Sequence, residues 1–370
     1  MGKRILLMYI NDNSGHHSAS LAIEKALKSL EGDVEVLNID AFNYTNPVLE
    51  KIINNTYMGI IKNTPEVWEY LYDNPKVVKN TQKLRELIHR FNSAKLKVLL
   101  SDFKPDVIGC TQAFPCGMVA DYKKTSGEDI PLVGILTDYM PHSYWLYDNV
   151  DFYVVPAEDT KEKLVHNGIL PDRVKVFGIP IDVKFAEKFD KDYVLQRLGI
   201  DNKLPIVLIM GGSQGLGPIR EVIGWLNRLV TNFQIIVATG TNKRLKESLL
   251  RKISRYKKKI LILDHSDEID KLMSVSSLVI TKSGGLTTAE ALVKGLPMII
   301  VNPIPGQEAN NAKFLLRCGA AVKANNEEDS AVLTESLLNN PVKLAHMRQA
   351  ALSHGKVHAA IDTSRLILEL

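Results

Sequence analysis

Cysteines are scarce in this chain, which has only Cys110, Cys116 and Cys318 among its 370 residues. Their number is odd and their spacing does not match that of metal ligands, which argues against a disulfide-stapled secreted domain and a cysteine-bound metal. The cysteine usage indicates a reducing compartment. Cys110 lies in an apolar run and is expected to be a buried thiol.

Long apolar runs are also missing, since none approaches the ~18 residues that a membrane-spanning helix needs. The N-terminus leads directly into the short run Ile5–Met8, which is too short for the core of a signal peptide and predicts a buried strand. Leu6 stands where a myristoylation signal requires Ser or Thr. We therefore expect a cytoplasmic protein.

A strong charge excess is the third absence, because 46 basic and 42 acidic residues give a formal net charge of only +4. This balance does not favour a nucleic-acid partner. Two segments are locally basic: 76–97 has seven bases against Glu86, and 243–259 has nine against Glu247. Each fits either a solvated helix face or a surface that docks on anionic lipid.

Short apolar runs alternate with helical patterns along the chain, which is typical of parallel βαβ units. The expected strands are 5–10, 34–39, 106–110, 132–136, 153–155 and 174–177 in the first half, and 206–210, 234–238, 260–263, 278–281 and 297–301 in the second. Helical periodicity fits 18–30 and 158–167. The sequence predicts an α/β chain with two doubly wound, Rossmann-like domains in tandem, and ligands in a cleft at the carboxyl ends of the strands.

The domain boundary is expected in the polar stretch 182–204, which separates an N-terminal domain, 1–181, from a C-terminal domain, 205–370. The final residues 355–370 have a helical pattern and are expected to pack back on the N-terminal domain. Residues 42–101 form a long insertion that is first aromatic and then basic.

Two glycine-rich turns follow expected strands in the second half. The first contains Gly211, Gly212, Ser213, Gln214 and Gly215, and the second contains Ser283, Gly284, Gly285, Thr287 and Glu290. Such turns let backbone N–H groups approach a phosphate at the start of a helix. The first turn matches neither a P-loop nor the dinucleotide fingerprint, so it fits an anion site or a purely structural turn. Glu290 is placed to accept both hydroxyls of a ribose or to act as a carboxylate near the positive end of a helix.

Polar side chains continue at the next strand ends. Gln307 and Glu308 begin a helix after Pro305-Gly306 and suit either a ring of sugar hydroxyls or ordinary helix capping. In the first half, Gly15 and His16 follow the first strand, and Asp138 and His142 follow the strand 132–136. Because parallel strands end at one sheet edge, these residues should converge, and His16 is suited to accept a proton from a hydroxyl.

These motifs resemble the inverting glycosyltransferases of family 28, over nearly the whole chain. The most specific are Lys282-x-Gly284-Gly285-x-Thr287-x-x-Glu290-Ala291 and Pro305-Gly306-Gln307-Glu308. Gly15-His16 and Thr137-Asp138-x-x-x-His142 resemble the branch of monogalactosyldiacylglycerol synthases and processive diacylglycerol glucosyltransferases. The resemblance implies a GT-B fold, a UDP-sugar donor that is UDP-glucose or UDP-galactose, and a diacylglycerol or related lipid acceptor at an anionic membrane surface. It also implies a peripheral position on the cytoplasmic face of the membrane.

The family's functional residues can be carried over position by position. The resemblance makes His16 and Asp138 the catalytic pair, either of which is the base, with Gly15 and His142 on the acceptor side. It implies that the turn Gly211–Gly215 contacts the diphosphate and that Asp264-His265-Ser266 holds the uracil. It also implies that Glu290 binds the ribose and that Gln307 and Glu308 bind the donor sugar. No cofactor and no metal are expected, because Asp190-Lys191-Asp192 lies in the expected linker and not after a strand.

Two departures and three rival functions remain at this stage. Asn13 stands where the family commonly has a glycine, and asparagine tolerates the positive φ of such a turn. Ser20 replaces a usual alanine. The rivals are transfer of N-acetylglucosamine to a polyprenyl-linked acceptor, epimerisation of a UDP-sugar, and a sugar-nucleotide sensor without catalysis.

Overall fold

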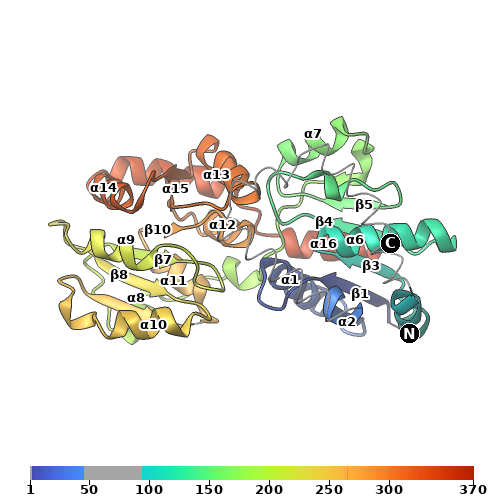
Figure 1. The fold of residues 1–370 in the computed structure, drawn as a ribbon, viewed down its shortest axis with the longest axis horizontal. Coiled ribbons are helices and arrows are strands. Elements are labelled where there is room, and N and C mark those ends of the chain that lie inside the picture. Colours follow the sequence, from blue (N-terminus) through green and yellow to red (C-terminus); the bar gives the residue numbers. More distant parts are fainter. Residues whose placement is uncertain (1, 46–93, 265) are drawn as a thin grey trace. The chain divides into compact units, whose positions relative to one another are not determined.

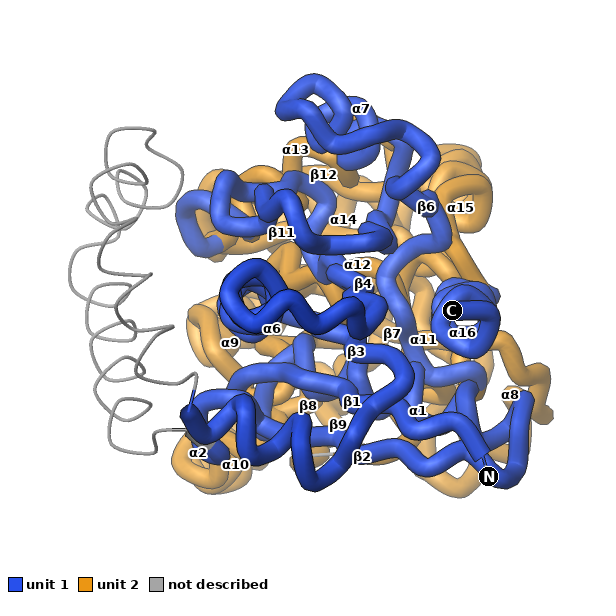
Figure 2. The backbone as a smooth tube through the Cα atoms, turned by 90° about the vertical axis from the view of Figure 1, so that its right-hand side faces the viewer, with its two compact units in different colours: residues 1–183, 304–307, 358–370 blue, residues 184–303, 308–357 orange. Residues whose placement is uncertain are grey.

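The computed structural model describes residues 2–45, 94–264 and 266–370. The chain divides into two compact units (Figure 2): unit 1 comprises 1–183, 304–307 and 358–370, and unit 2 comprises 184–303 and 308–357. Each unit contains a six-stranded parallel sheet with helices (Figure 1). The predicted fold class, two doubly wound α/β domains in tandem, is confirmed.

Unit 1 has the strand order β2-β1-β3-β4-β5-β6. Its strands are β1 (Arg4–Tyr9), β2 (Glu35–Asp40), β3 (Val107–Cys110), β4 (Leu132–Ile135), β5 (Phe152–Val154) and β6 (Val174–Lys175). Its helices are α1 (Gly15–Leu30), α2 (Ala41–Thr45), α6 (Ala113–Ser126), α7 (Glu158–His166) and α16 (Ala359–Glu369), with short 3₁₀ turns η1 (Ser143–Trp145) and η2 (Pro171–Arg173).

The core of unit 1 lies on both faces of its sheet, because side chains alternate along each strand. Ile5 and Leu7 of β1 face the layer that contains Ile367 of α16, whereas Leu6 and Met8 pack on the opposite side with the residues of α6. The C-terminal helix α16 lies beside α1 (Figures 1 and 2), and Ser364 Oγ donates a hydrogen bond to the carbonyl of Ile23. The last residues of the chain therefore complete the N-terminal core.

Unit 2 has the strand order β12-β11-β10-β7-β8-β9. Its strands are β7 (Ile206–Met210), β8 (Gln234–Ala238), β9 (Ile260–Leu263), β10 (Leu278–Thr281), β11 (Met298–Ile300) and β12 (Ala321–Lys323). Its helices are α8 (Lys191–Arg197), α9 (Ile219–Leu226), α10 (Lys243–Leu250), α11 (Ile269–Val275), α12 (Gly285–Val293), α13 (Gln307–Arg317), α14 (Glu327–Leu338) and α15 (Pro341–His354). The turn η4 (Ile253–Arg255) follows α10, and η3 (Val183–Ala186) precedes α8.

Most of the stretch expected as a linker, 182–204, is folded as part of unit 2. Asp190 caps α8 by accepting hydrogen bonds from the backbone N–H groups of Asp192 and Tyr193. Val194 and Leu195 are buried, and α8 packs against α11. This segment therefore contains a short amphipathic helix in which only two residues are buried, so its sequence is mostly polar.

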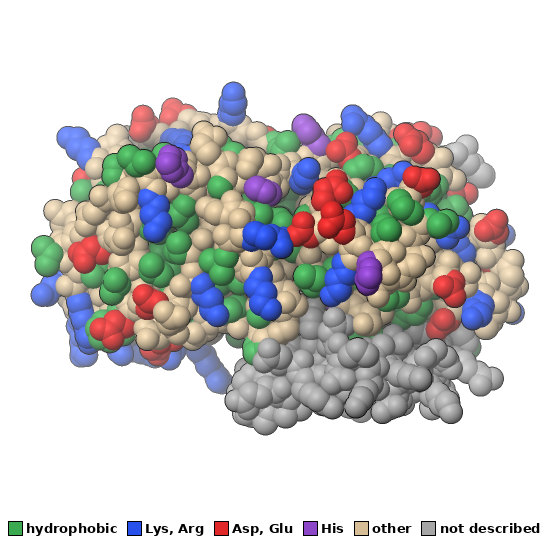
Figure 3. Space-filling model, turned by 90° about the horizontal axis from the view of Figure 1, so that it is seen from above, with side chains coloured by type: hydrophobic (Ala, Val, Ile, Leu, Met, Phe, Trp, Pro, Cys, Tyr) green, Lys and Arg blue, Asp and Glu red, His purple; other side chains and the backbone are tan. Residues whose placement is uncertain are grey.

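The insertion 42–101, with its predicted lipid-docking bases, lies mostly outside the described residues. Its final part is described: residues 94–103 are helical, and Leu96, Leu99, Leu100 and Phe103 enter the core of unit 1. Within the described ranges, no helix has both the length and the apolar composition to cross a membrane. On the face shown in Figure 3, acidic and basic side chains are intermingled, as the small net charge would suggest.

Candidate active site

The strand order of unit 2 reverses between β7 and β10, which pair in parallel with Met210 opposite Thr281 (Figure 1). At such a switch point the loops that leave two adjacent strands run to opposite sides of the sheet and leave a crevice between them. The loop after β7 is the first predicted glycine turn, and the loop after β10 is the second. The two turns are therefore neighbours at the carboxyl edge of one sheet.

The first turn is held closed by the loop that follows β8. The backbone N–H of Thr241 donates to the carbonyl of Ser213 at 2.8 Å, and Asn242 Nδ2 donates to the carbonyl of Gly215 at 3.2 Å. Gly215 has φ +57°, and a Cβ placed there would lie 2.0 Å from the carbonyl oxygen of Thr239. Only glycine fits this position, because both the backbone conformation and the close approach exclude a side chain.

The second turn leads into α12 with an open helix start. Gly284 is the N-cap residue of α12, and a glycine has no side chain with which to cap the first N–H groups of the helix. A Cβ built on Gly284 meets no atom within 4 Å among the described residues. Thr287 and Glu290 are half-buried in the first two turns of α12. The open helix end favours an anion.

Glu308, at the start of α13, is joined to the second turn. Its carboxylate Oε1 lies 2.8 Å from Lys282 Nζ, and its backbone carbonyl accepts a hydrogen bond from Ser283 Oγ at 2.6 Å. Asn311 Nδ2 donates to the carbonyl of Ser283 at 3.0 Å. Glu308 is only 5% exposed, whereas Gln307 is half-buried. The structure thus brings Glu308 together with the second glycine turn.

The segment Asp264-His265-Ser266 follows β9, and His265 lies outside the described residues. Asp264 is exposed and pairs with Lys246, with 2.7 Å between Oδ2 and Nζ. Ser266 Oγ accepts a hydrogen bond from the backbone N–H of Glu268 at 3.2 Å. The loop after β8 is joined to the end of β9, since Thr239 Oγ1 donates to the carbonyl of Leu263 at 3.0 Å.

In unit 1 the strand order reverses between β1 and β3, and His16 lies at that point, in the first turn of α1. Its Nδ1 is 2.8 Å from the carbonyl oxygen of Thr111, the first residue after β3, and 3.0 Å from Thr137 Oγ1. Thr111 Oγ1 in turn donates to the carbonyl of His16 at 2.9 Å. Because a carbonyl can only accept, Nδ1 carries the proton and the neutral ring keeps the lone pair on Nε2.

Burial lowers the pKa of His16 below its ordinary value, while the negative charge of Asp138 and the hydrogen bond to Thr111 act in the opposite direction. Loss of hydration disfavours the imidazolium form, and a nearby carboxylate favours it. The negative charge of Asp138 thus acts on the ring of His16. A neutral imidazole with a fixed tautomer beside a carboxylate is suited to accept a proton from a hydroxyl.

The loop before His16 is rigid at several points. Asn11 has φ +67°, its backbone N–H donates to Asp40 at 2.7 Å, and its side chain accepts from the N–H of Asn13. The residue with the left-handed backbone in this turn is therefore Asn11. Asn13, which stands where the family commonly has a glycine, has no positive φ. The ring of His17 stacks on Tyr9 at a centroid distance of 4.2 Å.

The other residues expected on the acceptor side lie next to this loop and to the loop after β4. Gly15 opens α1, whose N-cap Ser14 accepts a hydrogen bond from the N–H of His17. His142 is the N-cap of η1, and its ring lies 5.5 Å from that of Tyr144. The buried Cys110, predicted as a buried thiol, ends β3 beneath this edge.

Three parts of the candidate site could not be found from the sequence. Thr111 was not selected because a single threonine after a strand is unremarkable until strand order puts it beside the first strand. Lys282 was read only as part of a motif, without a partner. The clamp by Thr239–Asn242 was also missed, although Thr-Gly-Thr-Asn directly after a strand is a turn signal.

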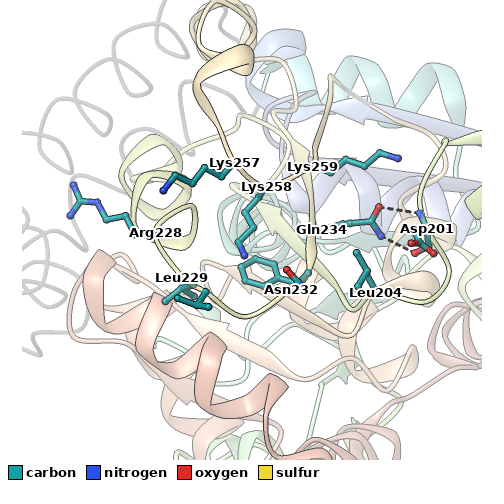
Figure 4. Close-up of a pocket in the computed structure, with 11 residues that line it drawn as sticks. Asp201, Leu204, Arg228, Leu229, Asn232, Gln234, Lys257, Lys258 and Lys259 are labelled. Carbon is teal, nitrogen blue, oxygen red and sulfur yellow. Dashed lines mark hydrogen bonds between the residues drawn. The ribbon is translucent and has the colours of Figure 1, made fainter.

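Unit 2 also has a hollow of about 550 Å³ at the amino edge of its sheet, near the starts of β8 and β9. Arg228 and Lys257 to Lys259 line it, but Lys257 and Lys259 extend in opposite directions and Arg228 points outward (Figure 4). Lys258 and Lys259 donate to the carbonyls of Thr231 and Gly199. These bases support the local fold and do not converge on one ligand position.

Two family models match the chain in tandem. Residues 16–181 match the family described as monogalactosyldiacylglycerol (MGDG) synthase, and residues 206–363 match the glycosyltransferase family 28 C-terminal domain. A processive diacylglycerol beta-glucosyltransferase from Bacillus pumilus is 31% identical over 368 residues, covering 99% of this chain and 94% of that protein.

Solved structures share the fold at lower identity. The match to MurG of Acinetobacter baumannii covers 100% of this chain and 100% of that chain, with a TM-score of 0.65 and 16% identity. Anabaena Alr3699/HepE, in a structure with UDP-glucose, covers 99% of both chains with a TM-score of 0.59 and 14% identity. These likenesses concern the architecture alone.

Proposed function

Since the chain belongs to the diacylglycerol glycosyltransferases with a family 28 C-terminal domain, as its motifs predicted, we propose that it transfers a hexose from a UDP-sugar to the hydroxyl of diacylglycerol, with inversion at the anomeric carbon. The observation that carries the chemistry is the fixed tautomer of His16, which leaves Nε2 as the proton acceptor. The Bacillus relative is named for glucose and the N-terminal family model for galactose, so the proposal extends to the hexose class.

Of the residues in the proposed donor site, Gln307 belongs to unit 1 and the others belong to unit 2. The first glycine turn would contact the diphosphate from one side of the crevice, with Gly211, Gly212, Ser213, Gln214 and Gly215. The second turn would contact it from the other side, with Ser283, Gly284, Gly285 and Thr287. Glu290 would accept the hydroxyls of the ribose, Gln307 and Glu308 those of the sugar, and His265 with Ser266 would hold the uracil. Support comes from the two turns being neighbours and from the open start of α12. Backbone N–H groups there would stabilise the leaving diphosphate.

The proposed acceptor site lies in unit 1, with Gly15 and His142 beside the catalytic pair. As the hydroxyl oxygen of diacylglycerol bonds to the anomeric carbon, the bond from that carbon to the diphosphate breaks. His16 Nε2 takes the hydroxyl proton, and Asp138 stabilises the imidazolium that forms. The role proposed for Asp138 is supported by the effect of its negative charge on the pKa of His16, which it raises.

Membrane contact completes the proposal. A diacylglycerol acceptor resides in a bilayer, so the enzyme would act as a peripheral protein on the cytoplasmic face, where anionic lipid attracts bases. The bases of 76–97 are the sequence candidates for that contact, and those before Lys95 lie outside the described residues.

Purified protein should be incubated with UDP-glucose, UDP-galactose or UDP-N-acetylglucosamine and with vesicles that contain or lack diacylglycerol. Mass and linkage analysis should find a β-hexosyl diacylglycerol only when a UDP-hexose and diacylglycerol are both present. If UDP-N-acetylglucosamine were the one donor accepted, the polyprenyl-acceptor alternative would be favoured instead. If a UDP-sugar were converted without lipid, the epimerase alternative would be favoured.

The variant Gly284→Ala tests the diphosphate contact. The added methyl group meets no described atom, so the melting temperature should stay unchanged, but it would stand where the diphosphate approaches the start of α12. The UDP dissociation constant, measured by calorimetry, should rise about tenfold or more, equivalent to one good charge-assisted hydrogen bond. Gly224→Ala is the matched control, since Gly224 in α9 is equally open and outside the proposed site. Unchanged UDP affinity in Gly284→Ala would contradict the contact.

The pH dependence of kcat/KM tests the base. The neutral form of His16 is needed, and its pKa is lowered, so activity should persist as the pH falls and decline only below 6.5. Asp138 raises that pKa, so Asp138→Asn should move the acidic limb to still lower pH while part of the activity remains. If Asp138 were the base, the same substitution would abolish transfer at every pH.

A further inference from the structure

The carboxylate of Glu308 is buried beside the second glycine turn. Glu308 is 5% exposed, and an ionised carboxylate at that depth needs a partner to offset its lost hydration. Lys282 Nζ, on a side chain that is 16% exposed, supplies that partner at 2.8 Å from Oε1. The pair thus places a buried carboxylate, with its charge balanced by an ammonium group, at the carboxyl edge of the sheet.

Two further hydrogen bonds fix the backbones that carry this pair. Ser283 Oγ donates to the carbonyl of Glu308 at 2.6 Å, and Asn311 Nδ2 donates to the carbonyl of Ser283 at 3.0 Å. Ser283 and Asn311 are both fully buried. Neither bond involves the ammonium group, so the turn and the start of α13 should stay joined when that group is removed.

The stem of Lys282 lies near Gly217, two residues beyond the first glycine turn. The nearest atom to a Cβ built on Gly217 is Lys282 Cγ, at 4.0 Å. Lys282 therefore extends from a position directly after β10, near the loop that follows β7, to the start of α13.

We propose that Lys282 is a positioning residue for the donor sugar, because its ion pair holds the carboxylate of Glu308 in one orientation, in which it accepts hydrogen bonds from sugar hydroxyls. An ionised carboxylate only accepts, with about four lone-pair positions, and the ammonium occupies one of them. The inference rests on the proposed function, in which Glu308 contacts the hexose. It adds that the sugar contact depends on a lysine that itself does not touch the sugar.

A double-mutant cycle measures this dependence. UDP and UDP-hexose binding should be measured by calorimetry for the wild type, Lys282→Met, Glu308→Gln and the double variant. Lys282→Met should weaken UDP-hexose binding about tenfold or more, the effect of losing a hydrogen bond to a charged group, and leave UDP binding unchanged. In the Glu308→Gln background, Lys282→Met should have no further effect. Lys282→Arg should restore most of the affinity.

The controls separate the outcomes. Lys28→Met removes the ammonium of another lysine–glutamate pair, Lys28–Glu24 at 2.6 Å in unit 1, and should change neither affinity. Equal loss of UDP and UDP-hexose binding would overturn the proposal and place Lys282 at the diphosphate. Additive effects of the two substitutions would also overturn it. Failure of the proposed function would show in the wild type, which would then bind UDP-hexose no more tightly than UDP and transfer no hexose.

Discussion

The variant His16→Ala is expected to lower kcat by about a hundredfold to ten-thousandfold, the range that general-base catalysis supplies. In the proposed mechanism Nε2 accepts the proton, because Nδ1 is committed to the carbonyl of Thr111. The UDP dissociation constant should stay within about twofold, since His16 belongs to unit 1 and the residues proposed to hold UDP belong to unit 2. Rates should be measured with saturating donor, and UDP binding by calorimetry.

His166→Ala is the matched control, because His166 is exposed at the end of α7 and outside the proposed site. Its kcat and UDP affinity should both equal those of the wild type. A His16→Ala enzyme that turns over normally, or one that loses UDP binding together with turnover, would show that His16 is not the base. Thr111 cannot be tested in the same way, because its contact with His16 uses the backbone carbonyl.

The variant Gly215→Ala is expected to destabilise unit 2 by about 3–4 kcal/mol. A left-handed backbone costs an L-residue about 1–2 kcal/mol. The new Cβ would also lie 2.0 Å from the carbonyl of Thr239, so the loop after β8 must move and lose its bonds to Ser213 and Gly215. Two such hydrogen bonds contribute about 1 kcal/mol each. The loss of unfolding free energy should be measured by urea titration, and hydrogen exchange of peptides from β7 and β8 should locate it in unit 2.

Gly212→Ala separates the two causes in that estimate. Gly212 has φ +70°, but a Cβ there meets no described atom within 4 Å. Its cost should therefore be the conformational one alone, about 1–2 kcal/mol. If both variants lost the same stability, the close approach of Gly215 to Thr239 would have no energetic weight, and the clamp on the first turn would not be rigid.

Much of the fold could be predicted from the sequence because the buried strands are continuous apolar runs. Ile206–Met210 and Leu278–Thr281 are entirely buried, as strands covered on both faces should be. The strand β12 was missed because Ala321–Lys323 is a three-residue edge strand with only one fully buried side chain. Likewise, α8 was hidden in the expected linker, since its two buried residues leave the polar pattern almost intact.

The candidate site could be predicted one strand end at a time, but not as an assembly. The glycine turns and His16 follow strands directly, so their position at a sheet edge was accessible. Which loops become neighbours depends on strand order, and that order results from packing between segments distant in the chain. The pairing of Lys282 with Glu308 and the contact of His16 with Thr111 span 26 and 95 residues. No local pattern encodes such distances.

The turn before His16 shows a finer limit. A family glycine at position 13 suggested where the backbone turns left-handed, yet the strained residue is Asn11, tied to Asp40 at the end of β2. The choice between two asparagines two residues apart depends on which N–H faces that carboxylate. Sequence comparison locates the turn but not the residue that carries its geometry.

The place of α16 in unit 1 has a consequence for biosynthesis. Ile5, Leu7 and Ile23, which are synthesised before unit 2, share a core with Ile367, which is synthesised after it. Unit 2 is encoded between them and can finish folding while the N-terminal half still waits for its final layer. Unit 2, which contains the residues proposed to bind UDP, can therefore fold before unit 1 is complete. A nascent chain, or one cleaved before α16, is expected to bind UDP without a finished N-terminal core.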